Sequence, residues 1–411
     1  MYRFHPSVRW SSGYPSSTEI VDQVTKIWRC YGLEERTKFN NRVTKVYANG
    51  KAGWCVNDQS NGMFDGIIAA VGTCGQIKVP NLPGQDHFQG DIVHSSDLDD
   101  KEAKDKRILI VGGGASAVEA LEWAAKTGAA EINVLSRSDK WIIPRNAVID
   151  ILLAFNVFGQ ETMFSWIPEN ILRLCFYRDL SDLSPTSKGL FTETPMVNSM
   201  VFDLIRERKA HWLRGDISSV EEDGIVFNHR AQGVPKGGPG HERLVKGNMI
   251  IMATGYKRPS LGFLPKEVFQ DPYQPPNWYI QTFPPGYPSI CANNCTYVNA
   301  IGTVGNYHIG IYTRLLLMFL VDPLTCPKEN LMKRWIDMTS VLKSRAPTGA
   351  FDFFTYTELL WWYFFIVLIN PFRWKWALFV FCGIEKWFPL SVVECEDSVR
   401  FGTGLGKSDD D

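Results

Sequence analysis

The chain has 411 residues, with 43 Lys and Arg against 44 Asp and Glu, which gives a formal net charge of −1. This length allows two or three domains with cores of their own, and the near-neutral charge gives no reason to expect a nucleic acid partner. The 9 cysteines include no CxxC pair, so we predict no metal site and no disulfide framework, and we expect a reducing compartment. Met1 is not followed by a cationic segment and an apolar core, so we expect no secretory signal.

The first part of the chain has the pattern of one helix followed by short strands. A helix is predicted from residue 19 to about residue 31. Three strand-like runs then predict a small antiparallel sheet: 37–39, 42–47 and 53–56. Residues 64–71 have the sequence FDGIIAAV, which predicts a buried strand, and a connector rich in Pro and Gly follows it.

Residues 106–137 show a complete strand–turn–helix–strand pattern. The unbroken apolar run 108–111 is typical of a parallel strand covered on both faces, and 132–135 predicts a second strand. Between them lies G-x-G-x-x-A, in which the first Gly permits a tight turn and the second lets the backbone approach a pyrophosphate. The N-terminus of the following helix attracts the anion. We therefore predict a dinucleotide site at Gly112, Gly113, Gly114, Ala115, Ser116 and Ala117.

The residues after the second strand indicate which dinucleotide binds. NAD sites place Asp or Glu there to hold the ribose 2′-hydroxyl. This chain has Ser136, Arg137 and Lys140 instead. A carboxylate would repel a 2′-phosphate, whereas a guanidinium and hydroxyls bind it, so the sequence predicts NADP. The alternative is a Gly-rich turn in a Rossmann-like domain with a solvated arginine.

The segment beyond residue 200 contains mixed elements. We expect a helix at 201–209, a hairpin within 218–227 and an exposed, mobile loop at 229–243. Residues 248–256 then carry the chain back toward its first part. A strand and turn are expected at 297–302, and a helix at 309–321.

Three segments follow one another in an order that is typical of one family of enzymes: residues 64–97, the glycine motif, and MIIMATGY at 249–256. Together they resemble the flavin-containing monooxygenases and their Baeyer–Villiger relatives. That family carries F-x-G-x-x-x-H plus a trailing aromatic residue between its two dinucleotide folds. Phe88, Gly90 and His94 match this interdomain motif, and Leu98 stands where the aromatic residue would be. The resemblance covers roughly residues 1–310.

The resemblance implies an α/β chain with two dinucleotide-binding, Rossmann-like domains that bind FAD and NADP. It implies an enzyme in which NADPH reduces FAD and one oxygen atom of O2 enters a lipophilic small molecule, with secondary metabolism as one setting for this reaction. Thr254 and Gly255 would lie near the contact between nicotinamide and flavin. His94 would belong to the interdomain linker, and we assign it no acid–base chemistry. Leu98 favours a general flavin monooxygenase over strict Baeyer–Villiger oxidation.

Four regions follow from this resemblance. They are the remainder of a FAD-binding domain with its linker, an NADP-binding domain, a return segment of the FAD domain and a helical, apolar C-terminal region: 1–100, 101–247, 248–320 and 321–411. The family begins with a strand and its own G-x-G-x-x-G for the FAD pyrophosphate, and this sequence contains no second such motif. We expect a truncated form of a full monooxygenase, because 17–72 keep the strand pattern of a FAD domain. The alternative is a chain that lacks the FAD fingerprint.

Two apolar runs, 359–369 and 377–384, lie near the C-terminus and are separated by NPFRWKW. Neither reaches the roughly 18 to 20 residues that span a bilayer. Tryptophans beside basic residues suit a membrane–water interface, so one interpretation is a peripheral, in-plane anchor within 359–384. The other is a buried helical hairpin that covers the substrate pocket. We expect the protein in the cytoplasm or on the cytoplasmic face of an intracellular membrane.

Three functions remain open from the sequence. The first is the FAD- and NADPH-dependent monooxygenase. The second is a pyridine-nucleotide flavoprotein reductase without oxygen insertion, which would need a redox partner or a CxxC motif. The third is a non-catalytic NADP-binding protein. The substrate, the type of oxidation and the oligomeric state are not encoded in these motifs.

Overall fold

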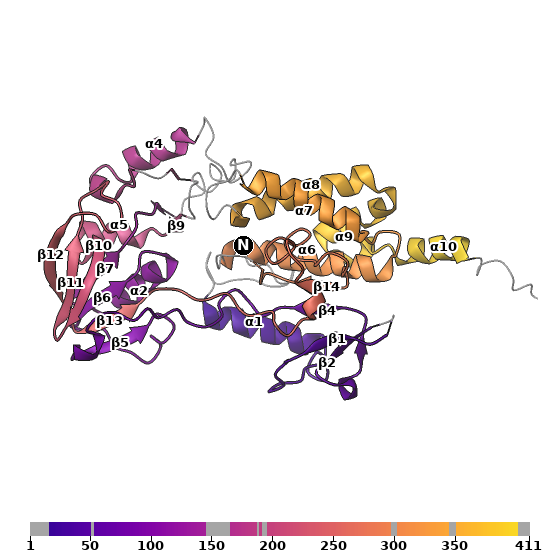
Figure 1. Cartoon of the computed structure of the whole chain (residues 1–411), viewed down its shortest axis with the longest axis horizontal. Helices are drawn as coiled ribbons and strands as arrows, with labels where there is room; N and C mark the ends of the chain where they lie inside the picture. The colour runs from indigo at the N-terminus through magenta and orange to yellow at the C-terminus, as the bar shows by residue number, and fades with distance from the viewer. Residues whose placement is uncertain are drawn as a thin grey trace, which may run out of the picture.

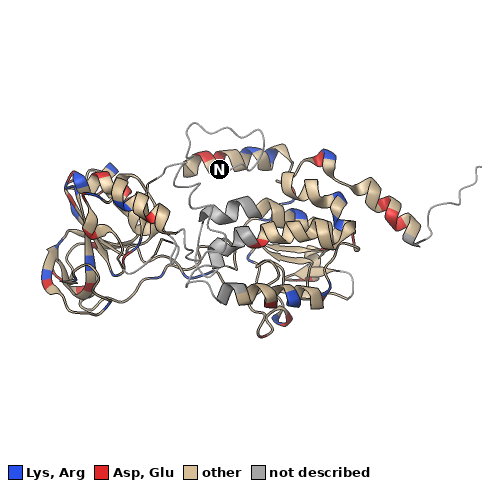
Figure 2. Cartoon of the chain, turned by 90° about the horizontal axis from the view of Figure 1, so that it is seen from above, with Lys and Arg blue, Asp and Glu red and all other residues tan. Residues whose placement is uncertain are grey.

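The computed structural model describes residues 16–50, 53–144, 165–186, 189–190, 195–296, 302–344 and 351–401. Figure 1 shows two lobes side by side. One lobe holds a large sheet with α2 and α5, and the other holds the C-terminal helices next to β4 and β14. Positive and negative side chains are mixed over both lobes (Figure 2), as a net charge of −1 leads one to expect.

The large sheet has 7 strands in the order β12-β11-β10-β7-β6-β13-β5. The strands from β5 to β10 in this order pair in parallel, and β11 and β12 extend the sheet as antiparallel strands. Their bounds are β5 Asp91–His94, β6 Arg107–Val111, β7 Glu131–Ser136, β10 Ala210–Glu221, β11 Gly224–His229, β12 His241–Lys246 and β13 Met249–Met252.

The large sheet includes strands from outside the predicted region 101–247. Both β5 and β13 lie in it, although we had placed 91–94 in the linker and 249–252 in a return segment. The physical reason is that β6 is a buried parallel strand and needs a hydrogen-bonded neighbour on each edge. β13 supplies that neighbour on the side opposite β7, with Ile250 aligned to Leu109.

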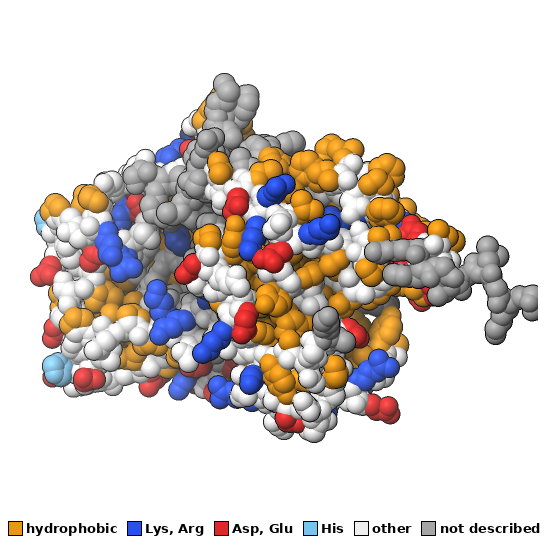
Figure 3. All heavy atoms as spheres, turned by 45° about the vertical axis from the view of Figure 1, so that its right-hand side comes forward, with side chains coloured by type: hydrophobic (Ala, Val, Ile, Leu, Met, Phe, Trp, Pro, Cys, Tyr) orange, Lys and Arg blue, Asp and Glu red, His pale blue; other side chains and the backbone are white. Residues whose placement is uncertain are grey.

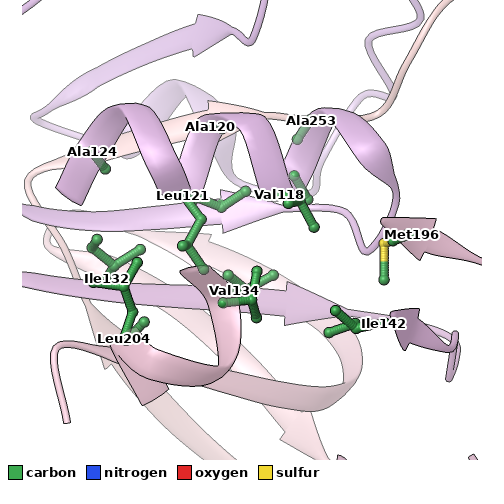
Figure 4. Packing of buried hydrophobic residues seen from close by; sticks show 14 of the residues in the cluster. Val118, Ala120, Leu121, Ala124, Ile132, Val134, Ile142, Met196, Leu204 and Ala253 are labelled. Carbon is green, nitrogen blue, oxygen red and sulfur yellow. The ribbon is translucent and has the colours of Figure 1, made fainter. Parts of the chain in front are cut away.

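Helix α2 (Ala115–Lys126) covers one face of the sheet. Figure 4 shows Val118 and Leu121 of α2 packed over Ile132 and Val134 of β7. The second face packs in a separate cluster that includes Phe88 of the linker. Both faces of the central strands are therefore buried, as the unbroken apolar runs predicted. Other elements of this lobe are β8 Ile142–Ile143, α4 Trp166–Cys175, β9 Met196–Val197 and α5 Met200–Arg206.

The second lobe begins with α1 (Ser17–Cys30), whose N-cap is Ser16 in a capping box with Glu19. β1 Val46–Ala48, β2 Trp54–Val56 and β3 Met63–Phe64 form an antiparallel sheet, and β4 Ile67–Ala69 pairs in parallel with β14 Ile290–Ala292. Residues 37–39 do not form a strand. The single strand expected at 64–71 is split between two sheets, because the chain changes partner at Asp65 and Gly66.

The C-terminal part is helical, with α6 Gly302–Val321, α7 Glu329–Ser344, α8 Phe351–Ile369, α9 Ala377–Cys382 and α10 Leu390–Phe401. The described 3-10 helices are η1 Gln59–Asn61, η2 Gln85–His87, η3 Ser181–Leu183, η4 Lys266–Val268, η5 Pro371–Trp376 and η6 Glu385–Trp387. Within the described ranges, no helix combines the length and the apolar character needed to cross a membrane. The strand expected at 297–301 lies outside the described residues.

Candidate dinucleotide site

The glycine turn begins where β6 ends. Gly112 has φ +135°, and its N–H donates to the Leu135 carbonyl at 3.1 Å. A Cβ at Gly112 would lie 2.3 Å from the Ala253 carbonyl oxygen, and one at Gly113 would lie 2.0 Å from Ser136 Oγ. These two positions therefore require glycine for reasons internal to the fold.

Gly114 differs from its neighbours. It is the N-cap of α2 with an extended backbone, φ −113° and ψ −166°, and a Cβ there would have nothing within 4 Å. The first N–H groups of a helix have no intrahelical partner, and the helix dipole places partial positive charge there. Ala115 and Ser116 form this first turn, while Ala117 is buried against the sheet. The open space in front of α2 thus fits an anion such as a pyrophosphate.

Residues 136–140, here called the selectivity loop, follow β7 beside this turn. Ser136 is buried, and its hydroxyl donates to the Ser138 carbonyl at 2.8 Å. Arg137 is exposed, and Lys140 is partly exposed. The structure therefore brings Ser136 against the glycine turn at Gly113 and leaves the two cations of the loop at the surface.

Two arginines that we did not single out from the sequence hold this loop. Arg230 Nη2 donates to the Arg137 carbonyl at 2.6 Å. Arg214, which is aligned with Ser136 across β10 and β7, forms an ion pair with Asp139. The position of Arg214 beside the loop could have been predicted, because the carboxyl ends of neighbouring parallel strands lie at the same edge of a sheet. Arg230 had no such signal, because it lies in the segment 229–243 that we expected to be an exposed loop.

The interdomain motif meets the turn after β13. His94 is buried, and its Nδ1 accepts a hydrogen bond from the Ser96 N–H at 3.2 Å. Its Nε2 therefore carries the proton and donates to the Gly255 carbonyl at 3.3 Å. The His94 ring also makes an edge contact with Tyr256, with centroids 5.3 Å apart. This histidine joins the end of β5 to the 254–256 turn.

The other residues of the motif and the turn are also fixed by contacts. Thr254 donates through its hydroxyl to the Lys78 carbonyl, and the Lys78 N–H donates to the Gly255 carbonyl at 2.9 Å. A Cβ at Gly90 would lie 2.1 Å from the Asn248 carbonyl oxygen, and Phe88 packs under the sheet. These contacts bring two chain segments together where they pass between the lobes.

A second polar region lies at the carboxyl end of β14. Thr282 Oγ1, Asn293 Oδ1 and Asn294 Oδ1 are buried without a hydrogen-bond partner. The Asn293 N–H donates to the carbonyl of Ala69, at the end of the parallel neighbour β4. Ligands of open α/β sheets bind outside the carboxyl ends of the strands, so these acceptors suit a polar ligand.

A groove of about 810 Å³ also lies beside β4. Most of the residues that line it are apolar, and they come from the segments 42–46 and 64–71, from Val56 of β2 and from Ser260 and Phe263. In the described part of the chain, β4 has β14 as its strand partner on one edge.

Comparisons with known proteins agree with this architecture. Residues 10–150 match the family model described as pyridine nucleotide-disulphide oxidoreductase. The FAD-binding monooxygenase ktnD of Aspergillus niger is 28% identical over 189 residues, which cover 42% of this chain and 29% of that protein. Over the matched residues, the chain is thus similar to flavin-dependent monooxygenases. This confirms the resemblance that the three sequence motifs indicated.

Two further comparisons concern a second curated protein and a solved structure. The 4-hydroxybenzoate brominase (decarboxylating) of Marinomonas mediterranea is 32% identical over 276 residues, 59% of this chain and 49% of that protein. A crystal structure of cyclohexanone monooxygenase bound to epsilon-caprolactone shares the fold with a TM-score of 0.62 at 14% identity, covering 86% of this chain and 84% of that one. The chain matches less than half the length of both curated relatives.

Proposed function

We propose that this protein is an NADPH- and FAD-dependent monooxygenase that places one oxygen atom of O2 in a lipophilic small molecule. The observation that carries the proposal is the open space at Gly114, in front of α2, next to a loop with Arg137 where an NAD site would have a carboxylate. A pyrophosphate fits at the helix N-terminus, and a 2′-phosphate fits beside the guanidinium.

The two cofactors differ in how well the described residues fit them. For NADP, the residues of the glycine turn would hold the pyrophosphate, and Arg137 and Lys140 would lie around the 2′-phosphate, while the buried Ser136 would support the loop beneath them. Thr254 and Gly255 would face the nicotinamide end. For FAD, the buried acceptors near Asn293 offer polar contacts, but the 411-residue sequence contains no second G-x-G-x-x-G turn. Bound flavin would supply the oxygen chemistry, and the protein would contribute binding, orientation and exclusion of water.

Cofactor titration tests the nucleotide assignment. We expect NADP to bind about ten-fold or more tightly than NAD, a difference of about 1.4 kcal/mol. Arg137→Ala should remove most of this preference. Arg206→Ala is the matched control. Arg206 is an arginine of the same lobe, but it ends α5 and pairs with Asp179 instead of lying in the selectivity loop. Equal affinity of the unmodified protein for both nucleotides would reject the assignment.

A non-catalytic NADP-binding protein is the second candidate, and the single glycine turn is the observation that favours it. Measurement of NADPH-dependent O2 uptake with added FAD separates the two. Uptake that depends on FAD supports the monooxygenase, whereas NADP binding without uptake supports the second candidate. NADPH oxidation that needs an added electron acceptor instead of substrate would indicate a flavoprotein reductase.

We also propose peripheral membrane contact through the C-terminal helices, at the cytoplasmic face of a membrane. On α8, Leu359, Trp362 and Ile366 are buried, and the opposite face is exposed. Figure 3 shows hydrophobic side chains gathered at the upper right of one face of the molecule, over the C-terminal helices. The exposed apolar residues of this region, here called the α8 surface, are Leu360, Phe364, Leu368, Ile369, Phe372, Trp374 and Leu378.

A further inference from the structure

Arg230 is a buried cation whose side chain links the selectivity loop to β10, through the Gly215 carbonyl, and to the segment that follows β11. Its side chain is 2% exposed. Nη2 donates to the Arg137 carbonyl at 2.6 Å, and Nη1 donates to the Val234 carbonyl at 2.7 Å. Nε lies 2.9 Å from Asp216 Oδ2 but makes no hydrogen bond there. The guanidinium thus sits under the selectivity loop and cannot reach solvent or a bound nucleotide.

A buried guanidinium is costly unless its charge and its N–H groups are matched, and an apolar side chain of the same size would fill the space at lower cost. Arg230 therefore needs a role other than packing. The contact that distinguishes Arg230 is the one with Arg137. Arg137 is exposed, while its carbonyl accepts a hydrogen bond from the buried Arg230 guanidinium. Fixing that carbonyl fixes the direction in which the Arg137 side chain leaves the backbone.

The far end of the same loop is held in a similar way. Arg214 pairs with Asp139, and its Nη2 donates to the Asp182 carbonyl at 2.8 Å. The Asp139 carboxylate would repel a phosphate group if it were free, so this ion pair also reduces the negative charge of the loop. Arg214 lies in β10, and Arg230 directly follows β11.

We propose that Arg230 is a positioning residue for cofactor selectivity. By holding the Arg137 carbonyl, it directs the Arg137 guanidinium toward the 2′-phosphate of NADP. This inference rests on the proposed NADP function of the selectivity loop. It assigns to the residue that follows β11 a part in choosing between NADP and NAD, although its side chain does not need to touch the nucleotide.

The test is a double-mutant cycle with NADP⁺ and NAD⁺ as probes in calorimetric titration. Arg230→Met should raise the Kd of NADP⁺ by about ten-fold and change the Kd of NAD⁺ less than about two-fold. In the Arg137→Ala background, Arg230→Met should have no further effect on NADP⁺. Arg206→Met is the control for loss of an arginine, and it should change neither Kd.

The outcomes separate the possible failures. If Arg230→Met weakens both nucleotides equally, or acts equally in the Arg137→Ala background, its role is general stability and the proposal is overturned. If Arg137→Ala alone leaves the NADP⁺ preference intact, the proposed function of the loop fails first. If the Met variant does not fold, Arg230→Lys takes its place. Lysine keeps the positive charge beside Asp216 but lacks the planar guanidinium with two Nη donors. An unchanged preference in a folded Lys variant overturns the proposal.

Discussion

The same substitution at two neighbouring glycines should separate the fold of the glycine turn from its binding role. At Gly113 an added methyl group would lie 2.0 Å from Ser136 Oγ and 2.8 Å from Ser136 Cβ. Ser136 is buried at the end of β7 and cannot move away freely. Overpacking of this kind costs about 1–3 kcal/mol, so we expect Gly113→Ala to lower the free energy of unfolding by that amount.

At Gly114 the methyl group would meet no atom of the chain within 4 Å, and the extended backbone accepts alanine. The loss of freedom in the unfolded chain and the weaker N-cap roughly offset each other, so the stability should change by less than about 1 kcal/mol. The methyl group would instead occupy the space of the pyrophosphate. Loss of one charge-assisted hydrogen bond costs about 1.5–3 kcal/mol, which raises Kd by about ten-fold to more than a hundred-fold.

Urea unfolding and calorimetric titration of both variants measure these effects. Since NADP and NAD share the pyrophosphate, Gly114→Ala should weaken both equally, unlike Arg137→Ala. Adding Ser136→Gly to Gly113→Ala should restore stability, because it removes the two atoms that the methyl group meets. A Gly114→Ala variant that binds like the unmodified protein would show that the pyrophosphate does not lie at this turn. A fully stable Gly113→Ala variant would contradict the close packing of the turn on β7.

Four further predictions concern other parts of the chain. The Tyr177 hydroxyl donates to the Ile142 carbonyl and accepts from its N–H, both at 2.8 Å, so Tyr177→Phe should cost about 2–4 kcal/mol of stability in urea unfolding. Burial, followed by nearby arginines, lowers the pKa of His229. The unfolded chain therefore binds more protons near pH 6, stability should fall as the pH drops from 7 to 5, and His229→Gln should flatten that fall in pH-dependent unfolding. Phe364 and Leu368 are 61% and 57% exposed, so replacing both with Glu should abolish cosedimentation with vesicles of phosphatidylcholine and phosphatidylserine; an unmodified protein that stays in the supernatant rules out the contact. The 411-residue chain should purify with less than one flavin per chain, and a yellow, fully loaded protein would show that its FAD site needs no second glycine turn.

The part of the fold that could be predicted from the sequence is the part specified by neighbouring residues. The strand, turn and helix at 107–126 follow from an apolar run, a glycine pattern and a helical segment in direct succession, and the structure has them at those places. The helix α1 was also predicted, with its start shifted by two residues because Ser16 and not a later residue caps it. Sequence signals of this kind determine structure over only a few neighbouring residues.

The elements that could not be predicted depend on partners far along the chain. β5 and β13 lie about 150 residues apart in sequence and pair with each other only because the sheet brings them together. The same holds for Arg230 and Arg137, whose contact joins positions 93 residues apart. Nothing in the Gly- and Pro-rich sequence around Arg230 indicates that this arginine is buried, because its burial depends on the packing of β10 and β11.

Two chain segments, one after β4 and one after β13, connect the two lobes and contact each other. The segment after β4 and the segment after β13 pair through a bridge between Ile77 and Tyr256, and His94 joins the second of them to β5. Both segments pass from one lobe to the other, so the candidate nucleotide site on the large sheet is held at a defined place relative to β4 and β14. His94 is thus buried at the end of β5, where its ring joins the Gly255 carbonyl to Ser96 at the junction of the two connectors.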